Sequence, residues 1–233
     1  MKIGLIGAMS EEIEQFKAEM EVHTIRTIAT VTFYEGTLGD IEIVLCKSGV
    51  GKVNAALTTQ VLIDMFEITN LIFTGVAGAL DTSLEVGDLV ISTSAMQHDI
   101  DASPLGFKRG EIPMYEGASD FLADSNLINI AEAAAGTLVN RRIMKGRVVS
   151  GDQFVANAEF VQELREEFGG VCVEMEGAAV AQVSSMNSIP FVIIRSMSDK
   201  ADGVASMSFS EFTILASQQS YLLVKEMLRQ LKG

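Results

Sequence analysis

The sequence contains no tryptophan, only three prolines, two cysteines and two histidines in 233 residues. It is also poor in basic side chains, with 17 Lys+Arg against 31 Asp+Glu and a formal net charge of −14. Nucleic-acid binding depends on cationic side chains that neutralise phosphates, so this balance disfavours a polyanionic partner and predicts no nucleic-acid binding. A small neutral or cationic ligand stays compatible with the charge.

The few cysteines and histidines do not form a metal-binding or disulfide pattern. Cys46 and Cys172 lie in apolar, strand-like runs without C-x-x-C spacing, which is typical of small buried hydrophobes in a reducing compartment. In HDID (98–101), His98 and Asp99 are adjacent and would point to opposite faces of a strand. The other histidine, His23, stands in a polar stretch. We therefore expect a turn or interface role for HDID and no metal site.

Long hydrophobic runs are missing as well. No segment approaches the roughly 18 uninterrupted apolar residues that indicate a membrane span. The first residues, MKIGLIGAM, are too short an apolar stretch for a signal peptide and are followed at once by acidic residues. The sequence predicts a soluble, cytoplasmic protein without a membrane partner.

The residues that are present alternate between strand-like and helix-like patterns. Strands are expected at 2–8, 31–38, 41–48, 71–75, 87–93, 143–150, 171–175 and 191–197. Helices are expected from the N-cap Ser10, over 53–66 (with Val53, Ala56, Leu57, Val61 and Met65 on one face), near 119–135, at 158–168, and from the capping box of Ser208 and Glu211. This alternation predicts a three-layer α/β fold, and the absence of repeats or linkers predicts one domain over 1–233.

Two glycine-rich stretches invite a phosphate-binding interpretation that their spacing does not support. In SGVGK (48–52), Val53 replaces the Ser/Thr of a Walker A loop and Cys46 holds its earlier glycine position. TGVAGAL (74–80) lacks the G-x-G-x-x-G spacing. Both stretches predict tight strand-to-helix turns that let a ligand approach the backbone.

Another irregular stretch, residues 100–118, holds two of the three prolines and predicts a long, functional loop.

Four carboxylates stand at positions where chemistry is plausible. Glu12 begins a helix at the edge of its apolar face, and its spacing alone favours a helix-dipole carboxylate over a general base. Asp199 follows Arg195 at the end of a predicted strand, where α/β sheets carry their sites, although a turn-capping role also fits. Glu174 and Glu176 in VCVEMEG (171–177) interrupt an apolar run, and burying them is costly unless something pairs with them.

Taken in order, seven segments resemble one family over essentially the whole chain. They are IGAMSEEI (6–13), SGVGKVNAA (48–56), TGVAGAL (74–80), SGDQFV (150–155), VEMEGAAVA (173–181), RSMSDKAD (195–202) and MSFSEF (207–212). The chain resembles the 5′-methylthioadenosine/S-adenosylhomocysteine nucleosidases of the nucleoside phosphorylase superfamily. The resemblance implies a mixed central sheet in an α/β/α sandwich, hydrolysis of adenine nucleoside thioethers in methionine salvage, and no metal or organic cofactor.

The resemblance also implies roles for individual residues. Asp199 matches the general acid that protonates N7 of adenine, and Glu12 matches the residue that activates water. Glu176 matches the acceptor of the ribose hydroxyls. The remaining matches line the nucleoside: Ala77, Gly78, Phe154, Val155, Met175 and Ser198 around base and ribose, and Met9, Val50 and Phe209 as apolar walls.

A loop segment of the family reaches into the neighbouring subunit. Leu105 and Pro113, with Ala102, match this segment and imply a homodimer whose partner completes the 5′-alkylthio pocket. Glu174 is left without an assigned role, and pairing with Arg195 is one interpretation.

One position departs from the family pattern. Many members place serine where this chain has Val76, which cannot donate a hydrogen bond to a phosphate or to a nucleophilic water. A phosphorylase of the same fold and a non-catalytic nucleoside sensor are the alternative functions. The acidic segment Met9–Glu12 disfavours phosphate, and the pair of Glu12 and Asp199 disfavours a sensor. The sequence does not rank the two substrates or decide on activity toward 6-amino-6-deoxyfutalosine.

Overall fold

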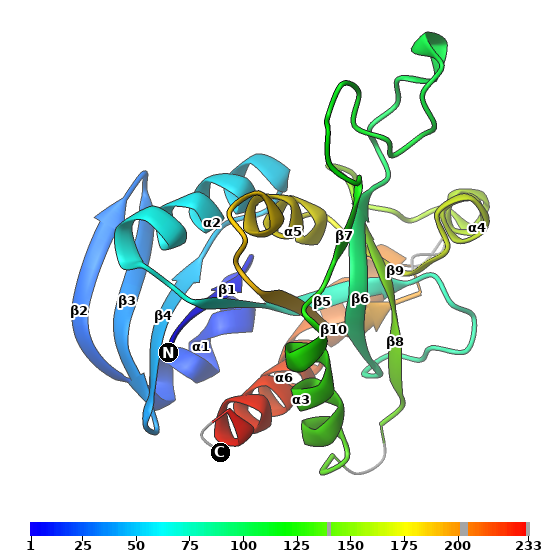
Figure 1. Cartoon of the computed structure of the whole chain (residues 1–233). Helices are drawn as coiled ribbons and strands as arrows, with labels where there is room; N and C mark the ends of the chain where they lie inside the picture. The colour runs from blue at the N-terminus through cyan, green and yellow to red at the C-terminus, as the bar shows by residue number, and fades with distance from the viewer. Residues whose placement is uncertain (139–140, 201–204, 232–233) are drawn as a thin grey trace.

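The computed structural model describes residues 1–138, 141–200 and 205–231, with the side chains of the last segment described from residue 212 (Figure 1). Its strands are β1 (Lys2–Gly7), β2 (Glu21–Ile28), β3 (Val31–Leu38), β4 (Ile41–Lys47), β5 (Asn70–Ala79), β6 (Leu89–Gln97), β7 (Asp120–Leu122), β8 (Ile143–Ser150), β9 (Gly170–Glu174) and β10 (Phe191–Asp199). Its helices are α1 (Ser10–Glu19), α2 (Lys52–Phe66), the short 3₁₀ turn η1 (Ser103–Leu105), α3 (Ser125–Ala135), α4 (Ala158–Phe168), α5 (Gly177–Met186) and α6 (Ala205–Gln230).

The strands form one mixed sheet, as the family resemblance implied. Its order is β10-β6-β8-β9-β5-β1-β4-β3-β2, with β7 paired to β6. Strand β10 pairs in parallel with β5 as well as antiparallel with β6, so β10, β6, β8, β9 and β5 form a closed ring. This closure was not predicted, because pairing between strands distant in sequence leaves no local pattern.

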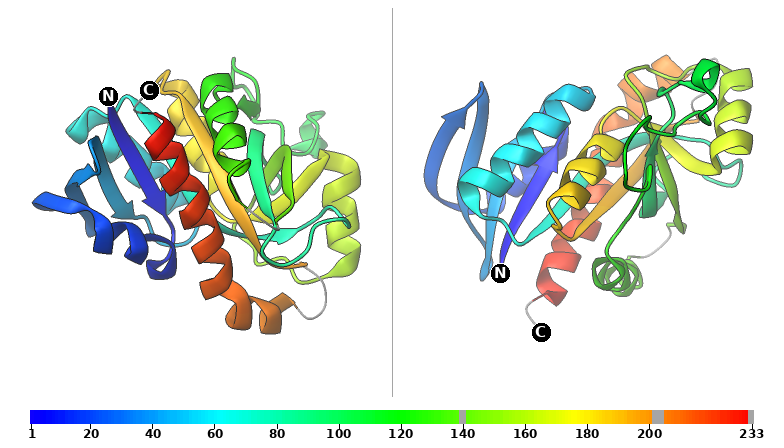
Figure 2. Two further views of the ribbon diagram at one scale, coloured as in Figure 1. Left: turned by 90° about the horizontal axis from the view of Figure 1, so that it is seen from below. Right: turned by 45° about the horizontal axis from the view of Figure 1, so that its top comes forward.

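Helices cover both faces of the sheet. Helices α1, α3 and α6 pack together on one face, and α2 and α5 pack together on the other, as the two views of Figure 2 show. Helix α4 lies against β9. Buried side chains fill the space between each helix layer and the sheet, with Phe16 and Leu127 on the α1 side and Leu62 and Phe66 on the α2 side. This arrangement confirms the predicted α/β architecture.

Several predicted boundaries were wrong for identifiable reasons. Strand β2 was missed because most of its side chains are exposed, so its sequence shows no apolar alternation. Residues 120–122 form β7 rather than helix, and α3 starts only at Ser125, behind the N-cap Asp124. Helix α6 begins at Ala205, so Ser208 is not its N-cap, and the side chains of that capping box lie outside the described residues.

The apolar face that the sequence predicts for α2 coincides only in part with the face that the structure buries, since Ala56 and Val61 pack against the core and the other three residues do not. The helix buries Ala55, Thr58, Thr59, Leu62 and Phe66. Val53, Leu57 and Met65 are 78%, 44% and 49% exposed. Because apolar and polar residues are both spread around α2, its hydrophobic pattern could not select a face. Helix α2 therefore presents a second apolar face to solvent.

Two further sequence predictions concern burial and membranes. Cys46 and Cys172 are buried and unpaired, which confirms that they act as small hydrophobes, and burial raises the pKa of both thiols. Within the described segments, no helix combines the length and the apolar character that crossing a bilayer requires.

Candidate active site

A cavity of about 290 Å³ opens at the carboxyl ends of β1, β5, β9 and β10. Strand ends of this kind are the usual place for ligands in α/β sheets. The cavity is lined by Ala8, Met9, Glu12, Val50, Val76, Ala77, Gly78, Gln153, Phe154, Val155, Val173, Glu174, Met175, Glu176, Ser198 and Asp199. Apolar walls thus surround four carboxylates.

Glu12 is the carboxylate that ties α1 to the sheet. Met9 rather than Ser10 is the N-cap of α1, and the Glu12 side chain turns back onto the chain that precedes the helix. Its Oε2 accepts hydrogen bonds from the amides of Ala8 (2.6 Å) and Met9 (2.9 Å), and its Oε1 accepts one from Val76 (3.0 Å) on β5. A Cβ atom at Gly75 would lie 2.3 Å from Oε1, so only glycine permits this approach.

The carboxylate of Glu12 is buried, and its charge is only partly compensated by nearby groups. The residue is 4% exposed, and burial raises its pKa, while the charge of Arg195 and the three amides act in the opposite direction. A helix-dipole role alone explains neither the burial nor the bond to β5. The spacing-based preference for that role was therefore incomplete.

Asp199 is the last residue of β10 and is 3% exposed. The hydroxyl of Ser198 donates to its Oδ2 over 2.8 Å. In the β10–β5 pair Asp199 lies opposite Gly78, whereas Glu12 bonds to Val76, two residues earlier on β5. These two positions are about 7 Å apart along the strand. The two carboxylates therefore enter one cavity from separate elements, α1 and β10, beside different positions of β5.

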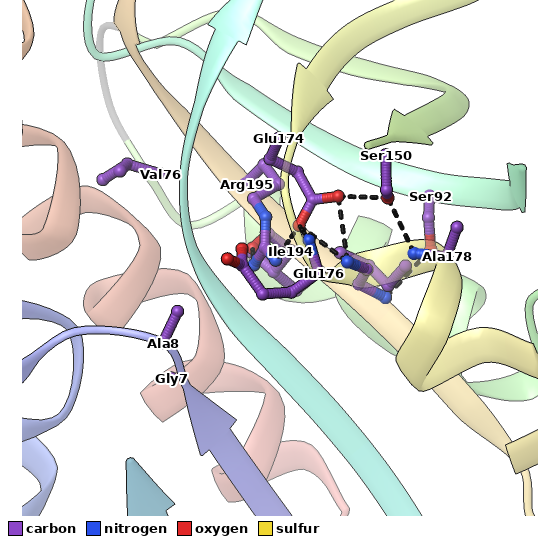
Figure 3. A network of polar contacts seen from close by, with 12 residues as sticks. Gly7, Ala8, Val76, Ser92, Ser150, Glu174, Glu176, Ala178, Ile194 and Arg195 are labelled. Atoms are coloured by element: carbon purple, nitrogen blue, oxygen red, sulfur yellow. Dashed lines mark hydrogen bonds and ion pairs between the residues drawn. The ribbon is translucent and has the colours of Figure 1, made fainter. Parts of the chain in front are cut away.

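Glu174 is the charge-compensated member of the pair that interrupts the apolar run (Figure 3). It accepts hydrogen bonds from Arg195 Nη2 (2.6 Å), from the Gly177 amide (2.8 Å to Oε2) and from the hydroxyl of Ser150. The Arg195 guanidinium in turn lies 3.9 Å from the centre of the Phe73 ring. This geometry confirms the interpretation that Glu174 pairs with Arg195, and it places Arg195 beneath the cavity rather than in its lining.

Glu176 is the less compensated member of that pair. Its Oε1 accepts a hydrogen bond from the Gly51 amide over 2.7 Å, and the residue is 6% exposed. Burial, together with the nearby charge of Glu174, raises the pKa of Glu176 to about 8. The carboxylate thus has remaining acceptor capacity toward the cavity.

The raised pKa of Glu176 predicts a pH-dependent stability. The folded chain binds this proton more tightly than the unfolded chain, so the free energy of unfolding should fall as pH rises from about 4.5 to about 8. This loss of stability should amount to about 3–4 kcal/mol between pH 5 and pH 8, and we expect Glu176→Gln to abolish it, as measured by urea titrations at each pH. Glu42→Gln, an exposed change on β4, is the control. An unchanged pH slope in the Glu176 variant would contradict the shift.

Most predicted site residues come together in the structure, and a few do not. The cavity lining includes Met9, Glu12, Val50, Ala77, Gly78, Phe154, Val155, Met175, Glu176, Ser198 and Asp199. Leu105 and Pro113 lie in the 100–118 loop, outside this lining. Arg195, also expected to bind substrate, lies outside it because its guanidinium pairs with Glu174. The side chain of Phe209 lies outside the described residues.

Sequence reasoning missed Ala8, Gln153 and Val173 as lining residues. Ala8 and Gln153 adjoin the predicted residues Met9 and Phe154, so adjacency in sequence was the available signal for these two, whereas Val173 adjoins Glu174, to which no role was assigned. As for metals, the described residues contain no group of three or more His, Cys, Asp or Glu side chains arranged to hold an ion.

Comparison with known proteins places this geometry in a family. The model of the phosphorylase superfamily matches residues 2–229. A 5′-methylthioadenosine/S-adenosylhomocysteine nucleosidase of Halalkalibacterium halodurans is 47% identical over 224 residues, which cover 96% of each chain.

Solved structures agree with this relationship. The nucleosidase of the same name from Neisseria meningitidis, in complex with methylthio-immucillin-A, is 40% identical with a TM-score of 0.94, covering 98% of this chain and 99% of that one. A futalosine hydrolase of Helicobacter pylori is 35% identical with a TM-score of 0.94, covering 99% and 98%. The chain therefore belongs to the 5′-methylthioadenosine/S-adenosylhomocysteine nucleosidase family of the phosphorylase superfamily.

Proposed function

We propose that the chain hydrolyses the N-glycosidic bond of 5′-methylthioadenosine and S-adenosylhomocysteine, releasing adenine and the 5-thioribose product. The observation that carries this proposal is the pair of buried carboxylates, Glu12 and Asp199, which face one apolar cavity from separate elements. Cleavage of an N-glycoside develops positive charge on the ribosyl ring, and an acid and a base on different sides divide the proton transfers. The names of the relatives supply the substrate class.

In the proposed reaction, Asp199 donates a proton to N7 of adenine as the bond between the base and C1′ breaks. The electron pair of that bond leaves with adenine, which departs as a neutral molecule. Glu12 takes a proton from a water molecule whose oxygen attacks C1′. The raised pKa of Glu12 suits a base that must hold that proton.

The remaining cavity residues are proposed to hold the substrate. Glu176 accepts the ribose hydroxyls, because two hydroxyl donors compensate a carboxylate that, among the described residues, accepts one hydrogen bond, from the Gly51 amide. Phe154 stacks on adenine, and the backbone of Val155 reads its amino edge. The other proposed contacts come from the backbone of Ala77 and Gly78, from Ser198 beside the acid, and from the walls Met9, Val50, Met175 and Phe209.

Hydrolysis is favoured over phosphorolysis by the charge of the cavity. Its described lining contains Glu12, Glu174, Glu176 and Asp199 and no lysine or arginine. Arg195 is buried and paired with Glu174, so it does not offer a free cation to a phosphate. A dianion would therefore meet repulsion rather than neutralisation.

Product analysis in phosphate-free buffer tests the proposal. Free adenine and a reducing thioribose should form from 5′-methylthioadenosine without added phosphate. A strict phosphate requirement would instead support the phosphorylase alternative. Nucleoside binding without turnover would support a sensor. Including 6-amino-6-deoxyfutalosine among the substrates tests the activity suggested by the name of the Helicobacter pylori relative.

We also propose that the enzyme is a homodimer of single-domain subunits. The 100–118 loop extends away from the body of the molecule in Figure 1, and its Leu105 and Met114 are 71% and 90% exposed. The second apolar face of α2 adds Val53, Leu57 and Met65 to the exposed apolar area. Such surfaces commonly mark protein contacts. The proposed partner loop, with Leu105 and Pro113, would complete the alkylthio end of the cavity.

Leu105→Asp tests the shared pocket. The change should weaken binding of 5′-methylthioadenosine by about tenfold or more while adenine binding changes little, because only the nucleoside carries the alkylthio group. Calorimetry measures both affinities, and sedimentation at assay concentration should show a dimer for the wild type. Ile25→Asp, at a 60% exposed site on the edge strand β2, is the matched control. A fully active monomer would refute the shared pocket and leave hydrolysis standing.

A further inference from the structure

Two sequence segments whose charged residues have no role in the proposed reaction meet beside the cavity. SGVGK (48–52) ends in Lys52, the first residue of α2, and HDID (98–101) directly follows β6. The Lys52 ammonium donates to Asp99 Oδ1 over 2.5 Å and to Gln97 Oε1 over 2.8 Å. The Lys52 and Asp99 side chains are only 16% and 18% exposed, so water screens this ion pair less than one on the open surface.

Asp152, in the loop after β8, joins these two segments. Its Oδ1 accepts a hydrogen bond from the Lys52 amide over 2.8 Å, and its own amide donates to Asp99 Oδ2 over 2.9 Å. Lys52, Asp99 and Asp152 thus bond to one another in a closed triangle, called here the Lys52 clamp. The clamp connects three segments that lie far apart in the sequence.

Two of the three segments that the clamp joins, the loop before α2 and the loop after β8, also carry residues that line the cavity. Val50 lines the cavity from the loop before α2, and Phe154 lines it from the loop after β8; each is 49% exposed. Between Val50 and Lys52, the Gly51 amide donates to Glu176 Oε1. Gly51 has φ +98° and passes so close to Asp152 that a Cβ atom would lie 3.2 Å from its Oδ1. The backbone geometry at the cavity rim therefore depends on the clamp.

The position of Lys52 is locally unfavourable, which argues for a role beyond helix formation. A cation in the first turn of a helix opposes the positive end of the helix dipole. The first turn of α2 holds no acidic residue that would compensate it. Departures from local preference concentrate at functional sites. The bonds to Asp99 and Gln97 from another part of the sheet supply the compensation that the helix lacks.

We propose that Lys52, Asp99 and Asp152 are positioning residues that fix the Val50–Gly51 and Phe154 loops in the geometry that binds the nucleoside. The proposal rests on the proposed function for its substrate. The clamp touches neither the acid Asp199 nor the base Glu12. Its loss should therefore weaken nucleoside binding and leave the chemical step intact.

Lys52→Met tests the proposal by two measurements. Amide hydrogen exchange should become faster in residues 49–52 and 151–155 and stay unchanged in the core strands. The KM for 5′-methylthioadenosine should rise about tenfold, which corresponds to the loss of one charged hydrogen-bonded contact, with kcat near the wild-type value. Lys52→Arg keeps the cation, so its KM should stay close to the wild-type value. Lys145→Met removes a lysine whose ammonium lies 2.7 Å from Glu132 on the surface, and it should change neither measurement.

Three outcomes would overturn the clamp: unchanged exchange in both loops, faster exchange throughout the sheet, or a fall in kcat at constant KM. The exchange measurement needs no substrate. If the wild-type chain releases no adenine, the proposed function fails, and the exchange of the two loops still confirms or refutes the clamp.

Discussion

Asp199→Asn is expected to lower kcat for 5′-methylthioadenosine by about 10²–10⁴-fold, because the amide has no acidic proton to give to the leaving base. The substitution keeps the size and shape of a side chain that is 3% exposed. The Ser198 hydroxyl, which now donates to Asp199 Oδ2, can still donate to the amide oxygen. The fold should therefore survive, and the loss should appear in the chemical step rather than in KM.

Steady-state kinetics with adenine detection measures this effect, and a thermal melt establishes that the variant is folded. Asp124→Asn is the matched control, since Asp124 caps α3 through the Leu127 amide and asparagine is an equally good N-cap. The control should retain wild-type kcat. A folded Asp199→Asn protein with near-wild-type kcat would remove Asp199 from the acid role.

The positions of the sheet strands could be predicted where a strand is buried on both faces, because its sequence is then a continuous apolar run. The run KIGLIGA and the run FVIIRSM are apolar on both faces, and they became the buried strands β1 and β10. Strand β2 carries no such signal, because it lies at the sheet edge with most side chains in water. The β10–β5 pairing that closes the ring joins segments far apart in the chain, and no local pattern encodes it.

The candidate site was predictable in its residues and not in its contacts. The family resemblance supplied Glu12, Glu176 and Asp199, and all three line the cavity. Spacing alone had favoured a helix-dipole role for Glu12. Nothing in the sequence around Glu12 shows that Gly75 leaves room for its carboxylate at the amide of Val76. Such contacts depend on the register of α1 against β5, which tertiary packing determines.

The charges around the cavity explain why one arginine is buried among several carboxylates. Arg195 bonds directly only to Glu174 among these carboxylates, yet its charge also acts on Glu12 and Glu176. Because Glu174 is further held by Ser150 and by helix-terminal amides, Arg195 stays fixed beneath the cavity. The described lining of the cavity holds no lysine or arginine, so no cation opposes the positive charge that the proposed reaction develops on the ribosyl ring.

Glu12→Gln should lower kcat by a similar factor of about 10²–10⁴, because an amide cannot take the proton of the attacking water. The two oxygens of Glu12 accept bonds from three amides, those of Ala8, Met9 and Val76. A glutamine offers one oxygen, so its NH₂ group must face at least one amide donor. We therefore expect a lower melting temperature as well, with the folded variant still binding 5′-methylthioadenosine in a calorimeter.

Glu11→Gln separates the two interpretations of this residue. Glu11 stands beside Glu12 in the first turn of α1 but is exposed, so it shares the favourable interaction with the helix dipole and lacks the cavity. If Glu12 acted only through the dipole, both variants would lose a little stability and keep full turnover. The base role requires the opposite result, with kcat lost in Glu12→Gln alone. Normal turnover in a folded Glu12→Gln protein would assign water activation to another group.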